Sequence, residues 1–533
     1  MQGFLLSFLK TRWLLLLVLL VFLCFKIPQL RYPFYIDEGW VYAPAVKTMA
    51  LHGPSLLPGS IPPDLSRGHP LMFHFLCALW IRCFGSSNIA IHSFPLLLSV
   101  IFLIVLFECC LRLFGHKAAV LLLLLVTTRV IFFVQSTFVY PEIMLAMFAF
   151  LSLYCYCKDY LLLTSLMLFM LFFTKEGGLV FGAVIGVDAL VAIFRRSENV
   201  RRRWLRLAAV LAPACLIGLF FVLQNAKFGW YVLPEHTDMI KPDWNAYYIM
   251  FKSGLYWAFR GDNAMYVLVF FIILLSLVPA LKFKNIRYLF LIPPAFIVYA
   301  QAEMFPTKAD GGVIWMLLYI LFFTVPVYYV LQLNKTLDES AQRFVLLLGI
   351  CVVAFLFYSS LTRIAYRYLL VDIIFVLIFL ALCTSTYVTT GGKNLFYFAI
   401  CCIALIGAYG FYSNDRVEDT QLGAFKVMNV QMQELAYLEK ENAYNKEIAY
   451  GCGYECGPFT DTLEGFLSSG RSFTRMERFP VGPHTEYAIF GNRCGVGDDY
   501  TRMLTNPDFQ TVYKVRDGEI WAEIFKRKYN QAK

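Results

Sequence analysis

Long apolar segments alternate with short polar segments over the first 412 residues of the chain. Most of the apolar segments approach the ~20 residues that a helix needs to cross a membrane. The alternation predicts a polytopic α-helical membrane protein with about thirteen transmembrane helices. The predicted helices span residues 13–25, 88–111, 118–136, 141–157, 160–174, 177–194, 205–224, 264–281, 288–303, 311–333, 344–361, 366–388 and 395–412.

Basic residues between the apolar segments indicate how the chain is oriented. One series of basic residues falls on the same predicted side, as in cytoplasmic loops: Arg112/Lys117, Lys158, the dense cluster at 195–206, Lys282/Lys284/Arg287, Lys335/Arg343 and Lys393. The first apolar segment has no small-residue cleavage site after it, so we interpret it as a retained helix with a cytoplasmic N-terminus. Segments 31–87 and 225–262 and the C-terminus are then extracytoplasmic, and the Trp- and Tyr-rich segment 225–262 is predicted to lie at the membrane surface.

After residue 412 the composition becomes polar and the long apolar segments end. Residues 428–442 have helical spacing of apolar positions, and 485–492 resembles a strand. Residues 509–528 predict a hairpin that turns at Asp517-Gly518. We therefore expect two domains, a transmembrane domain over 1–412 and a small extracytoplasmic α/β domain over 413–533.

The composition excludes a soluble or a disordered chain. Hydrophobic residues make up 59% of the sequence and charged residues 15%, and the mean hydropathy is +0.63. The net charge of +10 is accounted for by the basic loops, so nucleic-acid binding is not predicted. Most of the fifteen cysteines lie in apolar segments as small hydrophobic residues. Cys452, Cys456 and Cys494 lie in the polar C-terminal part and could include one disulfide.

Acidic and basic residues beside membrane segments are the candidates for chemistry, because charge near hydrocarbon is costly. Asp37 and Glu38 follow the first apolar segment, Glu142 opens a later helix, and Lys175 lies between two helices. Each has a structural alternative. Asp37 could cap a helix over 38–52, Glu142 could stabilise a helix N-terminus, and Lys175 could extend its amine to the membrane surface.

Arginines and histidines on the same predicted face could bind a phosphate. Arg67 and His69 lie in the first outer segment, and Arg363 and Arg367 lie at the outer end of a helix. Guanidinium groups bind phosphate through paired donors, although arginines in this position could also contact lipid headgroups. The histidines are too scattered to predict a metal site, so none is assigned and a divalent metal is left open.

Two segments of the first outer loop resemble a known family. IDEGWVYAPAVKTMALHG (36–53) and RGHPLMFHFLCALWIRCFG (67–85) are similar to the first extracytoplasmic loop of the GT-C glycosyltransferases. The resemblance is to their bacterial branch, which contains lipid A aminoarabinose transferases and protein O-mannosyltransferase-like enzymes. It covers about residues 5–390, with later matches at Tyr140-Pro141-Glu142, Phe173-Thr174-Lys175-Glu176-Gly177 and Arg367-Tyr368-Leu369-Leu370. Glu142 and His69 depart from the pattern, since relatives often have Asp and Lys there.

The resemblance implies an inverting glycosyltransferase at the outer face of the bacterial inner membrane. It would move a sugar from a polyprenyl-phosphate donor to a lipid, protein or glycan acceptor, without an assigned cofactor. The implied catalytic residues are Asp37 as the base, Glu142 as a group that orients a substrate, and Glu38 without a defined step. The implied donor-phosphate contacts are Arg67, His69, Lys175, Arg363, Arg367 and, more weakly, Arg260.

Two other classes of function fit parts of the sequence. A transporter or lipid flippase would also have many membrane helices, but the sequence shows no internal repeat and its charges gather at the outer face. A membrane anchor for a C-terminal binding domain would leave Asp37 and Glu38 without a role.

Overall fold

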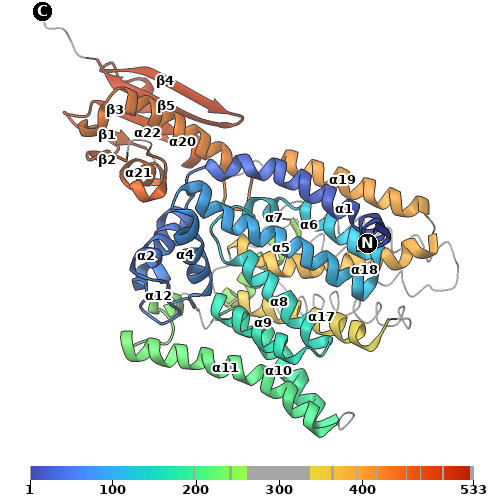
Figure 1. Cartoon of the computed structure of the whole chain (residues 1–533). Helices are drawn as coiled ribbons and strands as arrows, with labels where there is room; N and C mark the ends of the chain where they lie inside the picture. The colour runs from blue at the N-terminus through green and yellow to red at the C-terminus, as the bar shows by residue number, and fades with distance from the viewer. Residues whose placement is uncertain are drawn as a thin grey trace, which may run out of the picture.

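Helices make up most of the chain in the computed structural model. The structure describes residues 2–195, 199–238, 240, 243–260, 337–361, 365–391, 393–413, 417–451, 453–467, 470–494 and 497–528. The N-terminal part contains α1 (Gln2–Lys26), α2 (Ala43–His52), α3 (Pro63–Ser66), α4 (Met72–Phe84), α5 (Asn88–Phe114), α6 (His116–Thr127), α7 (Val130–Gln135), α8 (Glu142–Cys157), α9 (Leu161–Thr174) and α10 (Gly178–Arg195). The following part contains α11 (Val200–Phe228), α12 (Pro234–Asp238), α13 (Trp244–Arg260), α17 (Glu339–Ser359), α18 (Leu370–Gly391) and α19 (Lys393–Ser413) (Figure 1).

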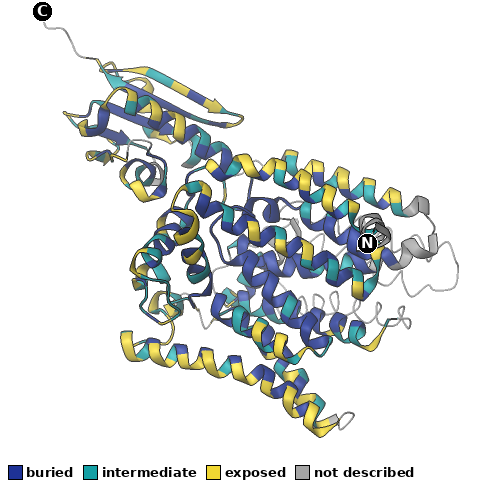
Figure 2. Ribbon diagram, in the orientation of Figure 1, coloured by how far each residue is buried: buried dark blue, intermediate teal, exposed yellow. Residues whose placement is uncertain are grey.

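Four helical segments in the described ranges are long and apolar enough to cross a membrane. They are Thr11–Arg31, which contains most of α1, and the helices α5, α11 and α17. Figure 2 shows buried residues through the interior of the helix bundle and exposed residues along α11. Those exposed residues include large apolar side chains, as expected for a helix that faces lipid. The protein is therefore a helical membrane protein.

The observed helices agree with most of the predicted segments in the described ranges, with one difference in continuity. The predicted segment 118–136 is divided into α6 and α7, because Arg129 has an extended backbone. Just before it, the Thr127 and Thr128 hydroxyls donate to carbonyls of the preceding turn, which competes with regular helix geometry. The predicted segments 264–281, 288–303 and 311–333 lie outside the described residues.

The C-terminal part contains a small mixed sheet covered by helix α20 (Gly423–Lys440). Its strands β1 (Ile448–Tyr450), β2 (Met476–Arg478), β3 (Tyr487–Gly491), β4 (Phe509–Asp517) and β5 (Ile520–Arg527) have the order β2-β1-β3-β5-β4 (Figure 1). β1 is parallel to both neighbours, and β5 is antiparallel to β3 and β4. The predicted hairpin is confirmed, since Asp517 pairs with Ile520 across the turn. The short elements here are η6 (Ala443–Asn445), α21 (Gly453–Thr460), η7 (Thr462–Glu464), η8 (Asn492–Cys494) and α22 (Asp498–Leu504).

The turn at η7 connects the C-terminal part to the helix bundle. Phe34 N donates to Glu464 O at 2.9 Å, and Lys47 Nζ donates to Leu463 O at 2.7 Å. Asn88 Nδ2, at the start of α5, donates to Gly465 O at 3.2 Å. These contacts fix η7 against the loop that carries Asp37 and Glu38. That loop is therefore covered by residues more than 400 positions later in the sequence.

The Glu464 side chain is buried in this contact. A Cβ at Gly39 would lie 3.1 Å from its Cγ, and a Cβ at Gly457 would lie 2.5 Å from its Oε1, so two glycines leave the space that it fills. Burial raises the pKa of Glu464 to about 8, with Asp461 as a further cause. The docked carboxyl is therefore neutral over most of the range below that value.

We expect the attachment of η7 to weaken as the pH rises. The pKa of Glu464 is raised from 4.5 to about 8 on folding, so its contribution to stability is fully present below pH 4.5 and lost towards pH 8. Glu464→Gln should remove this dependence, because the amide does not titrate. Thermal unfolding between pH 5 and 8 tests this, with Glu519→Gln, whose side chain is 83% exposed, as the control. Equal pH dependence in wild type and Glu464→Gln would contradict it.

Candidate active site

The loop after α1 directs Asp37 and Glu38 to different surroundings. Ile36 has φ of 49°, a strained conformation for a β-branched residue, and a π-helical turn over Glu38–Tyr42 follows (η2). Asp37 makes no side-chain cap to this turn. Its carboxylate instead accepts a hydrogen bond from Arg367 Nη2, so the N-cap alternative for Asp37 is not observed.

Glu38 points into the protein and is fully buried. Its Oε2 accepts from Tyr35 N at 3.1 Å, and its Oε1 accepts from Val139 N at 2.7 Å and contacts His92 Nε2 at 2.9 Å. The other ring nitrogen of His92 lies 3.2 Å from Leu30 O, so both ring nitrogens face an oxygen atom. Glu38 therefore stabilises the strained loop.

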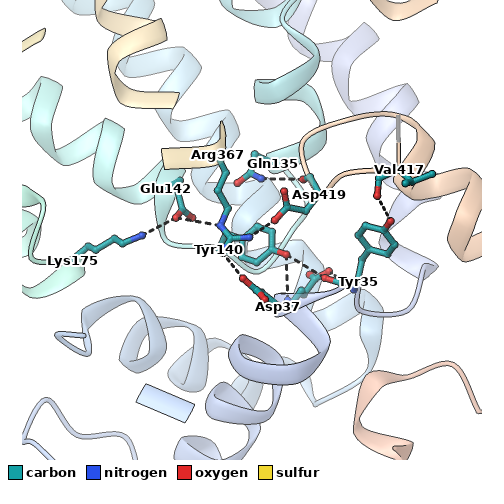
Figure 3. A network of polar contacts seen from close by, with 10 residues as sticks. Tyr35, Asp37, Gln135, Tyr140, Glu142, Lys175, Arg367, Val417 and Asp419 are labelled. Atoms are coloured by element: carbon teal, nitrogen blue, oxygen red, sulfur yellow. Dashed lines mark hydrogen bonds and ion pairs between the residues drawn. The ribbon is translucent and has the colours of Figure 1, made fainter. Parts of the chain in front are cut away.

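Arg367 connects residues from distant parts of the chain (Figure 3). It lies in the short 3₁₀ turn Tyr366–Leu369 (η5) before α18, and its side chain is 7% exposed. Nη2 donates to Asp37 and Nη1 donates to Asp419, while Nε lies 3.9 Å from Glu142 Oε1. The guanidinium carbon lies 4.8 Å from the centre of the Tyr140 ring. Three different carboxylates thus surround one buried guanidinium.

Lys175 adds a second cation to this cluster. Its Nζ donates to Glu142 Oε1 at 3.0 Å and lies 3.9 Å from the centre of the Tyr368 ring. α9 ends at Thr174, and the extended backbone of Lys175 turns its side chain toward Glu142 at the start of α8. Burial alone would lower the pKa of Lys175, but the Glu142 carboxylate raises it above the usual value. Lys175 is therefore a cation.

A neighbouring cluster consists of His69, His236 and Glu176, the residue that follows Lys175 in the sequence. Glu176 Oε2 lies 2.8 Å from His69 Nδ1, and the His69 and His236 rings are 5.2 Å apart. Ligand atoms of these three residues all lie within 4.8 Å of one another. Two imidazoles and a carboxylate are ligands of the kind that zinc prefers, so these residues could hold a divalent metal. Arg67 is half-buried and close enough to His236 to lower its pKa, after the larger effect of burial.

The structure thus brings together Asp37, Glu142, Lys175 and Arg367, and places Arg67 and His69 in the adjacent cluster. Arg363 and the Arg260 side chain lie outside the described residues. Asp419 was missed by the sequence analysis, because it lies in a polar segment outside the resemblance. The one feature of the sequence that could have pointed to Asp419 is its position shortly after the last apolar helix. That position does not indicate a contact with Arg367.

The cluster of Asp37, Glu142, Lys175 and Arg367 has the groups to bind an anion and to accept a proton side by side. Lys175 and Arg367 supply positive charge beside Asp37, whose side chain is 37% exposed and so accessible to a second molecule. Within the described residues, the buried Glu142 Oε2 has no hydrogen-bond partner and could accept one from a bound hydroxyl. Cations and carboxylates around a partly open position make this cluster a candidate active site.

The fold and the cluster define a helical membrane protein with a buried ionic site. Residues 68–223 match the family model described as dolichyl-phosphate-mannose-protein mannosyltransferase. The match includes His69, Glu142 and Lys175 and confirms the resemblance to this glycosyltransferase family. Asp37, Arg367 and Asp419 lie outside it. A search of curated proteins found no significant match.

Three solved structures are similar to this chain over most of its length. ArnT from Cupriavidus metallidurans in the apo state is 12% identical, covers 97% of this chain and 98% of its own, and has a TM-score of 0.49. The same protein bound to undecaprenyl phosphate is 14% identical over 98% of both chains, with a TM-score of 0.48. The archaeal oligosaccharyltransferase AglB from Archaeoglobus fulgidus is 12% identical over 90% of this chain and 69% of its own, with a TM-score of 0.43. These scores lie below 0.5, so the family model is the comparison that bears on function.

We expect Glu38→Gln to destabilise the protein by about 2–3 kcal/mol, because one buried N–H group would then lack an acceptor. The carboxylate meets three N–H groups, whereas the amide has one oxygen and adds donors of its own. Thermal unfolding in detergent measures the effect. Glu235→Gln, at an exposed position, is the control. A melting temperature equal to that of the control would show that Glu38 does not stabilise the loop.

Proposed function

We propose that the protein is an inverting glycosyltransferase that transfers a sugar from a polyprenyl-phosphate donor to an acceptor at the outer face of the membrane. The observation that carries the proposal is the group of Asp37, Glu142, Lys175 and Arg367 around one partly open position. The family match over 68–223 supports a lipid-phosphate donor, since its description names a dolichyl-phosphate sugar.

Asp37 is the proposed base. It is more exposed than either of the other carboxylates around Arg367, with 37% of its side chain accessible against 0% for Glu142 and 15% for Asp419. An acceptor hydroxyl can therefore reach Asp37 and transfer its proton there as the acceptor oxygen bonds to the anomeric carbon. The bond from that carbon to the phosphate oxygen breaks in the same displacement, so the configuration inverts.

The departing lipid phosphate needs compensation for its charge. Lys175 and Arg367 are the two cations in contact with Glu142, and fixed cations at the leaving group stabilise the developing negative charge. Arg67 and His69 extend this positive side toward the adjacent cluster. Arg363 and Arg260 remain predicted contacts of the donor phosphate.

The remaining carboxylates have supporting roles in the proposal. Glu142 Oε2 would accept a hydrogen bond from the donor sugar or the acceptor. Glu38, with its three internal bonds, would hold Asp37 in place rather than contact a substrate.

The proposed setting is a bacterial inner membrane protein with about thirteen helices, a cytoplasmic N-terminus and an extracytoplasmic domain over 413–533. The acceptor is a lipid, a protein or a glycan. The family match favours this enzyme over the transporter alternative. Mass spectrometry of lipids that copurify with the protein would identify the donor, since a polyprenyl-phosphate sugar names both the lipid and the sugar.

We expect Asp37→Asn to lower sugar transfer by about a hundredfold or more, the size of a general-base contribution. The amide has nearly the same shape but cannot accept the acceptor proton. The assay follows release of polyprenyl phosphate from the identified donor by purified protein in detergent. Asp64→Asn, at an exposed position of the same loop, should keep normal activity. Near-normal turnover by a folded Asp37→Asn protein would exclude Asp37 as the base.

A further inference from the structure

Asp419 reaches the site from the segment that joins α19 to α20. Tyr35 donates through its hydroxyl to Val417 O, and Gln135 Nε2 donates to Asp419 O at 3.1 Å. These bonds hold the segment against the Asp37 loop and the end of α7 (Figure 3). The Asp419 side chain is 15% exposed and contacts Arg367 Nη1. A residue from the start of the C-terminal part is therefore built into the candidate active site.

Arg367 shares its donors between Asp419 and the proposed base. Nη1 donates to Asp419 and Nη2 donates to Asp37, while Nε faces Glu142. Carboxylate and phosphate oxygens bind guanidinium through the same paired geometry. A donor phosphate that binds Arg367 must therefore take a position next to, or instead of, a carboxylate.

The local charge favours replacement of a carboxylate. Three carboxylates and the cations Lys175 and Arg367 leave one net negative charge when all five groups are ionised. A bound phosphate would increase this excess in a largely buried place, where like charges repel strongly. One carboxylate has to leave or take up a proton.

Asp419 is the carboxylate that can be replaced at least cost. Glu142 already forms an ion pair with Lys175, and Asp37 must stay near the acceptor. Asp419 lies in a segment outside the helices, so it can move without unwinding one. Burial also raises the pKa of Asp419, although Arg367 opposes that effect, so its negative charge is less favoured in this place.

We propose that Asp419 binds the same guanidinium nitrogen of Arg367 that the donor phosphate binds. When the donor binds, Asp419 leaves Arg367. This inference rests on the proposed function. Asp419 is a positioning residue, because it holds the Arg367 side chain toward Asp37 while no donor is bound. Its competition with phosphate lowers the affinity for the donor lipid.

Binding of undecaprenyl phosphate to the purified full-length protein in detergent tests the competition. Asp419→Asn should bind this lipid about fivefold more tightly than wild type, the effect of removing one competing charge. Asp419→Glu, which keeps the charge, should bind like wild type. Asp498→Asn, at an exposed position of α22, is the matched control and should also bind like wild type.

A double-mutant comparison connects the effect to Arg367. In an Arg367→Gln background, Asp419→Asn should leave the affinity unchanged, because the shared partner is gone. Equal or weaker binding by Asp419→Asn than by wild type would overturn the competition while leaving the proposed function intact. No binding of undecaprenyl phosphate by wild type would overturn the polyprenyl-phosphate donor and the competition together.

Hydrogen exchange in the wild-type protein tests the same inference without a variant. Release of Asp419 removes an ion pair that holds residues 417–421, so undecaprenyl phosphate should speed amide exchange in this segment. Unchanged or slower exchange at a saturating lipid concentration would overturn the inference, even if Asp419→Asn fails to fold.

Discussion

The burial of the Arg367 guanidinium is the constraint on which the rest of this site depends. A charge with so little access to water must be paired, and removal of a partner from such a pair commonly costs ~3–5 kcal/mol. Its partners come from three distant segments, Asp37 after α1, Glu142 at the start of α8, and Asp419 after α19. Pairing of this one side chain therefore requires the first loop, the middle of the bundle and the C-terminal linker to meet.

A second network prepares the first segment for this contact. Glu38 binds two backbone N–H groups and His92, and the Tyr140 hydroxyl donates to Tyr35 O at 3.2 Å. These bonds compensate for the left-handed conformation at Ile36, which turns Asp37 away from the interior and Glu38 into it. Adjacent carboxylates thus have different surroundings because the backbone between Tyr35 and Glu38 is bent.

Much of the fold and part of the site could be predicted from the sequence, for identifiable reasons. The apolar segments predict the helices, and the Asp517-Gly518 turn predicts its hairpin, because both patterns depend only on neighbouring residues. Asp37, Glu142, Lys175 and Arg367 were recognised as charges beside membrane segments. Adjacent residues on a helix point about 100° apart, so Asp37 and Glu38 are not expected to share one face. Which of them is buried was not predictable, since it depends on one backbone angle at Ile36. The contact of Asp419 was not predictable either, because it joins residues 52 positions apart across helix α18 and helix α19.

The boundary between the helix bundle and the C-terminal part is not a boundary of the site. η7 bonds to the Asp37 loop through Phe34, and the linker before α20 bonds to it through Tyr35. The C-terminal part therefore contacts the loop that carries the proposed base through two adjacent residues. The polar C-terminal residues, which contain no catalytic motif of their own, thus belong to the physical description of the candidate active site, because they contact the loop that carries Asp37.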